Sequence, residues 1–230
     1  MPSDLNANPP PDPSKGSCML YLVRHGATNN NLAKPPLLQG CGANPDLSVE
    51  GYRQAARTAA QLAHLPICAV YSSPLRRAMQ TGTTIAELHA VPCQSVHELI
   101  EVDVGDWQDR HWGEIAKNEP EAYGNFIHNP ESHPYAGGEN FSDVSRRILP
   151  VFNHLLEMHL DQSIVVIGHN VVNRVFLAHV ASIPLSKSRA IRQANCGINI
   201  IRRQNKKSQL ITLNATFHLV TDNQKRDPAR

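Results

Sequence analysis

The chain is short of several features that mark other protein classes. Its 230 residues carry a formal net charge of only +2, so the composition predicts no polyelectrolyte partner such as nucleic acid. The five cysteines are odd in number and include no C-x-x-C pair, which argues against a disulfide framework or a zinc site and suits a reducing cytosol. No apolar run approaches membrane-spanning length. We therefore expect a soluble, cytoplasmic protein that binds neither nucleic acid nor membranes.

Common nucleotide and metal motifs are also missing. The sequence contains no Walker A run, no G-x-G-x-x-G and no H-E-x-x-H, and its histidines show no clustered ligand spacing. We thus expect no metal and no cofactor. The one basic cluster, Arg202-Arg203 with Lys206-Lys207, lies between two strand-like runs without interleaved aromatic residues. It is therefore predicted to be a solvated hairpin turn.

The length of the chain suits one sizeable α/β core. Residues 1–17 are rich in proline and polar residues and lack the apolar segment of a signal peptide, so we expect a flexible tail. Residues 18–220 are predicted to form a single domain, and residues 221–230 a second flexible tail.

Short apolar runs alternate with amphipathic helical patterns along this domain. Residues 29–45 are predicted to be a loop, and Pro74 is expected at the first position of a helix capped by Ser72-Ser73. Pro150 should kink a long helix that begins near Phe141. The expected strands are 19–23, 67–71, 91–97, 163–167, 198–202 and 210–213, and further helices cover 49–64 and the region after His169. This alternation predicts a three-layer α/β/α sandwich around a mostly parallel sheet.

Residues 100–140 break the alternation, because they contain two tryptophans, scattered proline and glycine, and no long periodic run. We expect a small insertion that covers the active-site edge of the sheet, with a short helix at 112–118. We call this insertion the cap.

Two histidines directly follow buried strands. His25 comes after the strand at 19–23, within Arg24-His25-Gly26, and His169 follows the strand at 163–167. If these strands are parallel neighbours, both imidazoles emerge at the carboxyl edge of the sheet, where α/β proteins place ligands. Arg77, in the first turn of the next helix, points to the same edge. Two arginines and helix amino-terminal N–H groups predict a pocket for phosphate.

The chain resembles the histidine phosphatase superfamily, in its phosphoglycerate-mutase-like branch. The resemblance covers residues 18–215 in order and with the family's spacing. It rests on the segments Leu22-Val23-Arg24-His25-Gly26-Ala27-Thr28, Asp46-Leu47-Ser48-Val49-Glu50-Gly51, Ser72-Ser73-Pro74-Leu75-Arg76-Arg77-Ala78-Met79-Gln80-Thr81, Leu99-Ile100-Glu101 with Gly105-Asp106-Trp107, Gly137-Gly138-Glu139-Asn140 and Val166-Ile167-Gly168-His169.

The resemblance implies that His25 is the nucleophile and becomes a phosphohistidine. It further implies that Glu101 is the proton donor and that three side chains bind the phosphoryl group, a set we call the phosphate clamp: Arg24, Arg77 and His169. Asn31 matches an asparagine that helps to bind phosphate, and Gly26 and Asn170 are further candidate substrate-binding residues. The implied function is metal-independent hydrolysis of a small phosphomonoester.

Two other functions compete with this interpretation. A mutase of the phosphoglycerate type would return the phosphoryl group to its substrate, but the segment after Glu101 is closer to the phosphatase pattern. A catalytically idle binding module is disfavoured because every expected catalytic position is filled. The sequence departs from the family pattern at Ala27, at Gln108-Asp109 and at Asn170, which bears on the substrate more than on the chemistry.

Several residues have a plainer interpretation beside the functional one. Cys18 and Arg24 have the Cys-x5-Arg spacing of cysteine phosphatases, but the strand between them favours a buried structural cysteine. Arg76 is expected in solvent. The remaining alternatives stay open: a role in cap packing or in the substrate pocket for Trp107 and Trp112, and a role in the site or in surface ion pairs for Glu139 and Arg146.

Overall fold

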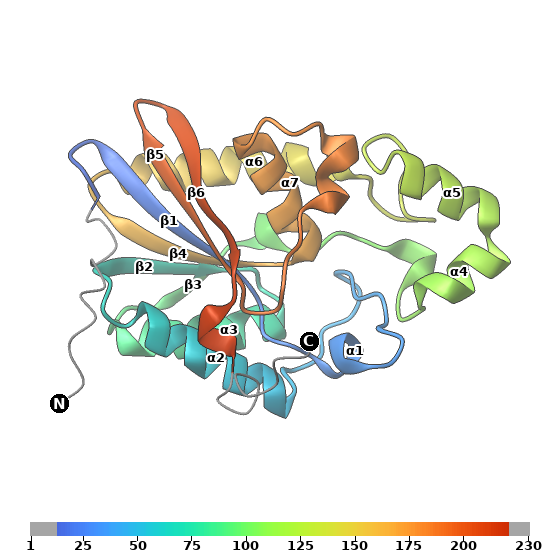
Figure 1. Ribbon diagram of the computed structural model, residues 1–230, viewed down its shortest axis with the longest axis horizontal. Helices are drawn as coiled ribbons and strands as arrows, with labels where there is room; N and C mark the ends of the chain where they lie inside the picture. Colours follow the sequence, from blue (N-terminus) through green and yellow to red (C-terminus); the bar gives the residue numbers. More distant parts are fainter. Residues whose placement is uncertain (1–12, 221–230) are drawn as a thin grey trace, which may run out of the picture.

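The fold is organised around one six-stranded sheet, seen in a computed structural model that describes residues 13–220 (Figure 1). The strand order is β3-β2-β4-β1-β5-β6. The first four strands of this order run parallel to one another. β5 pairs antiparallel with β1, and β6 pairs antiparallel with β5. The strands are β1 (Ser17–Arg24), β2 (Ile67–Ser72), β3 (Cys93–Ser95), β4 (Ser163–Gly168), β5 (Ile198–Gln204) and β6 (Lys207–Ala215).

The central strands are buried on both faces, because helices cover the sheet on either side. Leu20 and Leu22 of β1 pack into one apolar cluster with α6 (Phe141–Met158) and α7 (Asn170–Val180). Met19, Tyr21 and Val23 point the other way, into a second cluster with α2 (Val49–Leu62) and α3 (Arg76–Leu88). Figure 1 shows these helix pairs on opposite faces. The predicted three-layer α/β/α sandwich is confirmed.

The cap lies beside the sandwich, on the side away from the β5–β6 hairpin (Figure 1). It contains α4 (Trp112–Asn118), as predicted, and also α5 (Pro120–His128), which the sequence reading missed. Its core is aromatic: Trp107, Phe126 and Tyr135 are buried and meet mostly edge to face. The cap is therefore a packed unit that shares its core with the α6–α7 face.

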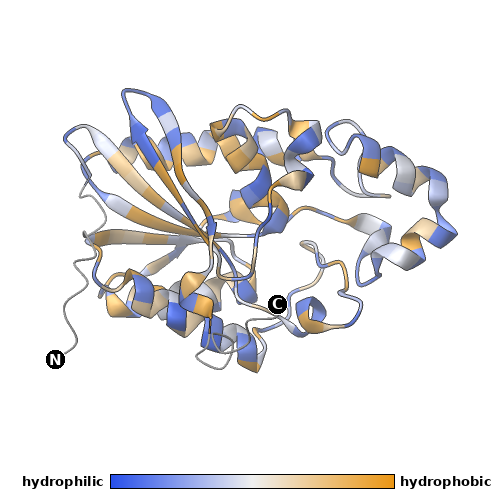
Figure 2. Ribbon diagram, in the orientation of Figure 1, coloured by the Kyte–Doolittle hydropathy of each residue, from blue (hydrophilic) through white to orange (hydrophobic). Residues whose placement is uncertain are grey.

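The basic cluster forms a tight hairpin turn, as predicted. Asn205 and Lys206 both have positive φ, which is the conformation of the two-residue turns that suit twisted strands. Figure 2 shows this hairpin tip as hydrophilic, in contrast to the apolar strands behind it.

The structure corrects three expectations about local elements. Residues 29–45 include a one-turn helix, α1 (Asn29–Leu32), because Thr28 and Asn31 close a capping box around it. The helix α3 begins at Arg76, with Leu75 at its N-cap and no side-chain cap, so Pro74 is not its first residue. β1 begins at Ser17, inside the expected tail, most of which lies outside the described residues, as do residues 221–230.

The remaining described elements are short 3₁₀ turns. The turns are η1 (His97–Leu99), η2 (Gly105–Trp107), η3 (Leu185–Ala190) and η4 (Phe217–Leu219). The helix α6 runs through Pro150 over 18 residues. Within residues 13–220, no helix combines the length and the apolar character that crossing a membrane requires.

Candidate active site

The two predicted histidines meet at the carboxyl edge of the sheet. β1 pairs with β4 so that Arg24 lies opposite Gly168, and the next residue of each strand is a histidine. The ring centroids of His25 and His169 are 5.0 Å apart, with the planes tilted by 58°. Both side chains are almost fully buried. The expected juxtaposition is confirmed.

The ring of His25 is held in one tautomer. Its Nδ1 lies 2.7 Å from the carbonyl oxygen of Gly26, and because a carbonyl only accepts, Nδ1 carries the proton. Burial, followed by the charges of Arg77 and Arg24, lowers the pKa of His25 well below its ordinary value. The imidazole is therefore neutral at neutral pH, and its Nε2 lone pair is available for attack.

His169 is the N-cap residue of α7 and bonds to a hydroxyl rather than to a carbonyl. Its Nε2 lies 2.7 Å from Oγ of Ser73, and its buried Nδ1 has no partner within the described residues. Burial, then the charge of Arg77, lowers the pKa of His169 well below its ordinary value. Ser73 was expected to cap α3, but its hydroxyl bonds to this ring, and the backbone N–H that it accepts is that of Leu75 (3.3 Å), the residue that precedes the helix.

The two arginines of the clamp are held by neutral oxygens. Nη1 of Arg24 donates to the carbonyl of Gln193 (2.6 Å). Arg77, with no exposed surface, donates from Nη1 to the carbonyl of Ala43 (2.7 Å) and from Nη2 to that of Gly40 (3.1 Å). Neither guanidinium pairs with a carboxylate anywhere in residues 13–220. Their positive charge is thus available to an anion.

Burial lowers the pKa of Arg24 and of Arg77 to about 10, so both stay cationic at neutral pH. The side-chain amide of Gln39 adds a further contact: with its oxygen turned to Arg77, it accepts from Nε at 2.7 Å. Gln39 and Gln193 were missed by the sequence reading, since no local pattern shows that a distant loop will supply an acceptor.

Glu101 lies where the amino terminus of α7 approaches the pocket. Its carboxylate accepts the N–H groups of Val102 (3.0 Å), Val171 (3.3 Å) and Val172 (3.4 Å). These donors fix the side chain, which is only 4% exposed, at the same edge of the sheet as His25 and His169. The carboxylate therefore faces the pocket that also contains Arg24 and His25.

Three minor candidates also lie at this edge. Asn31 uses its side-chain oxygen to accept from Thr28 N–H (3.1 Å) and from Asn195 Nδ2 (3.2 Å), and it lines the pocket. Asn170 lines the pocket as well, with a buried Oδ1 that has no partner among the described residues. Gly26 supplies the acceptor for His25, and a Cβ there would lie 2.6 Å from the carbonyl oxygen of Gly51. The backbone approach at this position explains the glycine.

The pocket has a volume of about 350 Å³, and most of its wall beyond the phosphate end is apolar. Trp112 lines it, whereas Trp107 is fully buried in the cap and donates from Nε1 to Glu119 (2.8 Å). Trp107 thus has the packing role, whereas Trp112 lines the pocket and also packs in the cap, with ring centroids 5.8 Å from Phe126 and 5.9 Å from Tyr123. Apart from the candidate site residues, the pocket is lined by Pro35, Pro36, Leu37, Leu38, Gln39, Val102, Val104, Trp112, Gly113, Tyr135 and Val171.

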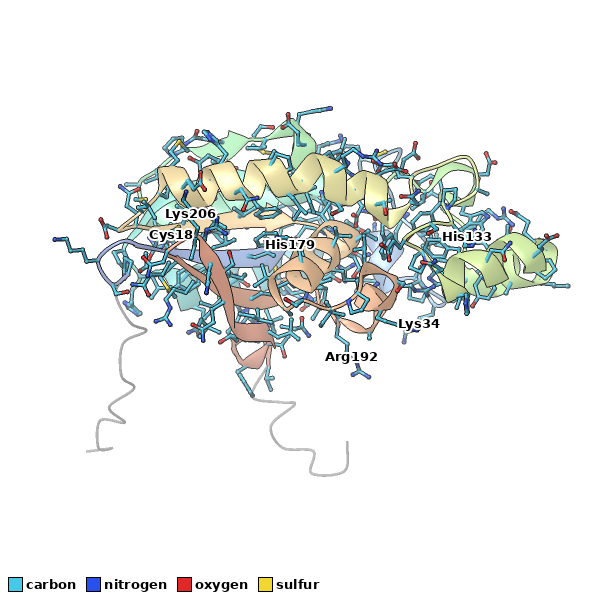
Figure 3. The ribbon with its side chains drawn as sticks, turned by 90° about the horizontal axis from the view of Figure 1, so that it is seen from above. Cys18, Lys34, His133, His179, Arg192 and Lys206 are labelled. Atoms are coloured by element: carbon cyan, nitrogen blue, oxygen red, sulfur yellow. The ribbon has the colours of Figure 1, made fainter. Side chains whose placement is uncertain are left out.

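Other residues take the plainer role. Cys18 is fully buried, and burial raises the pKa of its thiol to about 12. Figure 3 shows Cys18 at the end of the sheet opposite the cap. Cys18 lies at the start of β1, whereas His25 follows the end of that strand. Arg76 and Arg146 form exposed ion pairs with Asp46 and Asp143. Residues 13–220 bring together no group of three or more His, Cys, Asp or Glu side chains that could hold a metal ion.

Comparisons with known proteins agree with this geometry. The family model of the histidine phosphatase superfamily (branch 1) matches residues 20–216. Phosphoserine phosphatase 1 of Hydrogenobacter thermophilus is 29% identical over 201 residues, 87% of this chain and 93% of that protein. Adenosylcobalamin/alpha-ribazole phosphatase of Salmonella typhimurium is 30% identical over 165 residues, 72% and 80%. The structure of Bacillus stearothermophilus YhfR superposes with a TM-score of 0.81 at 25% identity, covering 88% of this chain and all of that one. The chain belongs to the histidine phosphatase superfamily, branch 1.

Proposed function

We propose that this protein hydrolyses a small phosphomonoester, without a metal ion, through a phosphohistidine on His25. Nε2 of His25 bonds to phosphorus as the bond from phosphorus to the alcohol oxygen breaks. The electron pair goes to that oxygen, which takes a proton from Glu101. A water molecule then attacks phosphorus, its proton returns to Glu101, and the N–P bond breaks to release inorganic phosphate and neutral His25.

The observation that carries this proposal is the state of His25. A buried imidazole that is neutral at neutral pH, with Nδ1 bonded to Gly26, presents its Nε2 lone pair in a fixed direction. Arg24 and Arg77 flank it with charges that no carboxylate of the described residues neutralises. Such charges stabilise the equatorial oxygens of a phosphoryl group during in-line transfer.

Glu101 is the proposed proton donor and acceptor. Its carboxyl group lines the same pocket as His25 and is directed there by three backbone N–H groups. A group in this place reaches the leaving oxygen in the first half of the reaction and the water in the second. His169, bonded to Ser73, completes the phosphate clamp.

The pocket supports an organic phosphate as the substrate. About 350 Å³ exceeds what a phosphoryl group needs, and the additional wall is formed by side chains such as Leu38, Val104 and Trp112. Relatives are named as a phosphoserine phosphatase and as an adenosylcobalamin/alpha-ribazole phosphatase, and phosphoserine is a small phosphomonoester. We propose that this chain acts on a substrate of that size, with no nucleic acid or membrane as partner.

We also propose a cytoplasmic location and a single domain over residues 18–220. All five cysteines are free, including the exposed Cys68, which suits a reducing compartment. Both faces of one sheet share their apolar clusters with the helices and the cap, which supports one folding unit.

The test is to trap the intermediate. Rapid acid-free quench during turnover of a radiolabelled aryl phosphate should give base-stable, acid-labile phosphate on His25. His25→Ala should lose several orders of magnitude in kcat, while His133→Ala, an exposed histidine of the cap, should retain activity. Near wild-type turnover by His25→Ala would overturn the mechanism. Transfer of the label to a second phosphoglycerate, in preference to water, would favour a mutase.

A further inference from the structure

An ion pair contacts the backbone of the segment that carries Glu101. Arg147, in the second turn of α6, forms a two-pronged contact with Glu139: Nε to Oε1 at 3.0 Å and Nη2 to Oε2 at 3.1 Å. Both side chains are more than two-thirds buried. Planar, two-pronged pairing of this kind fixes direction as well as distance.

The same guanidinium also binds the backbone on either side of Glu101. Nη1 donates to the carbonyls of Glu98 (2.5 Å) and Ile100 (2.8 Å), and Nη2 donates to the carbonyl of Glu101 itself (3.3 Å). Three carbonyls within four residues of chain therefore converge on one side chain from another element. A lysine could not reproduce this arrangement, because it lacks the planar fork.

Glu139 holds the next part of the segment. Its Oε2 accepts the N–H of Asp103 (2.9 Å), and its own N–H donates to the carbonyl of Asp103 (2.9 Å). Between them, the two partners bond to four residues of the six-residue stretch from Glu98 to Asp103. The backbone on both sides of Glu101 is thus held by hydrogen bonds to Arg147 and Glu139.

We propose that Arg147 and Glu139 are positioning residues for proton transfer by Glu101. This inference rests on the proposed function of Glu101. Neither residue lines the pocket, and their charged groups bond to each other and to the backbone of residues 98–103, so we assign them no contact with substrate. Their contribution is to keep the carboxyl group within hydrogen-bonding reach of the leaving oxygen, where a displacement of about 1 Å can cost about 100-fold in rate.

A positioning role for the acid predicts a dependence on the leaving group. An alkyl phosphate leaves as a basic alkoxide and needs the proton, whereas p-nitrophenyl phosphate scarcely needs it. We expect Arg147→Met to lose roughly 100-fold in kcat/KM with glycerol 2-phosphate and less than about 5-fold in kcat/KM with p-nitrophenyl phosphate. The ratio kcat/KM is the measure to use, because it reports phosphoryl transfer to His25 and not the later hydrolysis, in which Glu101 acts as the base with either substrate. Glu139→Gln, which keeps the volume of the side chain, should show the same pattern more weakly.

The neighbouring residue gives a matched control. Arg146 also lies on α6 but is exposed and contacts only Asp143, so Arg146→Met should leave both rates unchanged. Inhibition by inorganic phosphate should change little in Arg147→Met, because the arginines of the phosphate clamp come from other elements and the charge of Arg147 is the smallest of the causes that lower the pKa of His169. If Arg147→Met does not fold, Glu139→Gln and Arg147→Lys carry the test.

The outcomes separate this inference from the proposed function. Glu101→Gln should show the same dependence on the leaving group as Arg147→Met. Equal losses on both substrates by Arg147→Met, with a selective loss by Glu101→Gln, would overturn the positioning role alone. Equal losses by Glu101→Gln would overturn the acid assignment and this inference with it.

Discussion

Replacing Arg77 with methionine separates what the buried guanidinium does for catalysis from what it does for the fold. Methionine is close in length and apolar, so it can occupy the buried space without a charge. In the proposed reaction Arg77 gives the phosphoryl group two charge-assisted hydrogen bonds, each worth about 1.5–3 kcal/mol. The loss of both should lower kcat/KM by about 10² to 10⁴, since each 1.4 kcal/mol corresponds to about tenfold.

The same substitution should change the ionisation of both histidines. After burial, the charge of Arg77 is the largest cause that lowers the pKa of His25 and of His169. Arg77→Met should therefore raise both pKa values, although burial keeps them below the ordinary value. The acid limb of the pH–rate profile should move to higher pH, and NMR titration of the histidine rings should show the same change directly.

Arg76→Met is the control, because Arg76 precedes Arg77 on α3 but forms an exposed pair with Asp46. It should leave activity and both titrations unchanged. Retention of kcat/KM within about threefold by Arg77→Met would refute the role of Arg77 in binding phosphate. An unchanged or lower pKa for His25 would refute the electrostatic account.

Four further predictions concern the pocket, the turn after β1, the histidines and metal. Trp112→Ala should lower kcat/KM by about 10- to 150-fold for naphthyl phosphate, through loss of roughly 1.5–3 kcal/mol of apolar contact, but leave glycerol phosphate little changed. Gly26→Ala should lower the free energy of unfolding, measured by thermal unfolding, by about 1–3 kcal/mol and abolish activity. The reason is that its Cβ would lie 2.6 Å from a carbonyl oxygen of α2. Gly124→Ala is the control, because a Cβ at this position of α5 would lie in open space. Because His25 and His169 have lowered pKa values in the folded state, the unfolded state binds more protons. The free energy of unfolding, measured with denaturant, should therefore fall as the pH drops below about 6.5. A free energy of unfolding that rises on acidification would contradict this. Activity should survive exhaustive chelation, and its loss with recovery on added Mg²⁺ or Zn²⁺ would refute metal independence.

Sequence reasoning succeeded where function depends on the ends of buried strands. The predicted strands 19–23 and 163–167 consist almost entirely of apolar residues, so both strands are visible locally, although β1 begins two residues earlier than predicted, at Ser17. The two histidines after them meet because β1 and β4 pair in parallel. The helix at 112–118 was also placed correctly. The roles assigned to these histidines remain predictions until the intermediate is trapped.

It failed where a polar side chain has two competing partners. The hydroxyl of Ser73 is a good helix cap by its local sequence, but the structure places it 2.7 Å from His169, 96 residues away. The side-chain oxygen of Asn31 closes the cap of α1, a role that the sequence analysis did not foresee, and its expected role in binding phosphate stays a prediction. Arg147 gave no signal at all, since its acceptors are backbone carbonyls that any sequence would supply. Long-range contacts of this kind are invisible in a single chain.

The strand order has a consequence for the dynamics of the protein. β1 and β4 occupy the middle of the sheet, and each is hydrogen-bonded on both sides, so their amides should open only when the whole domain unfolds. The backbone of both histidines continues directly from these strands. The cap, by contrast, contributes no strand to the sheet and can exchange its amides through smaller local openings. Fluctuations that admit substrate and release product can therefore occur in the cap while the atoms that bind and attack phosphorus keep their places.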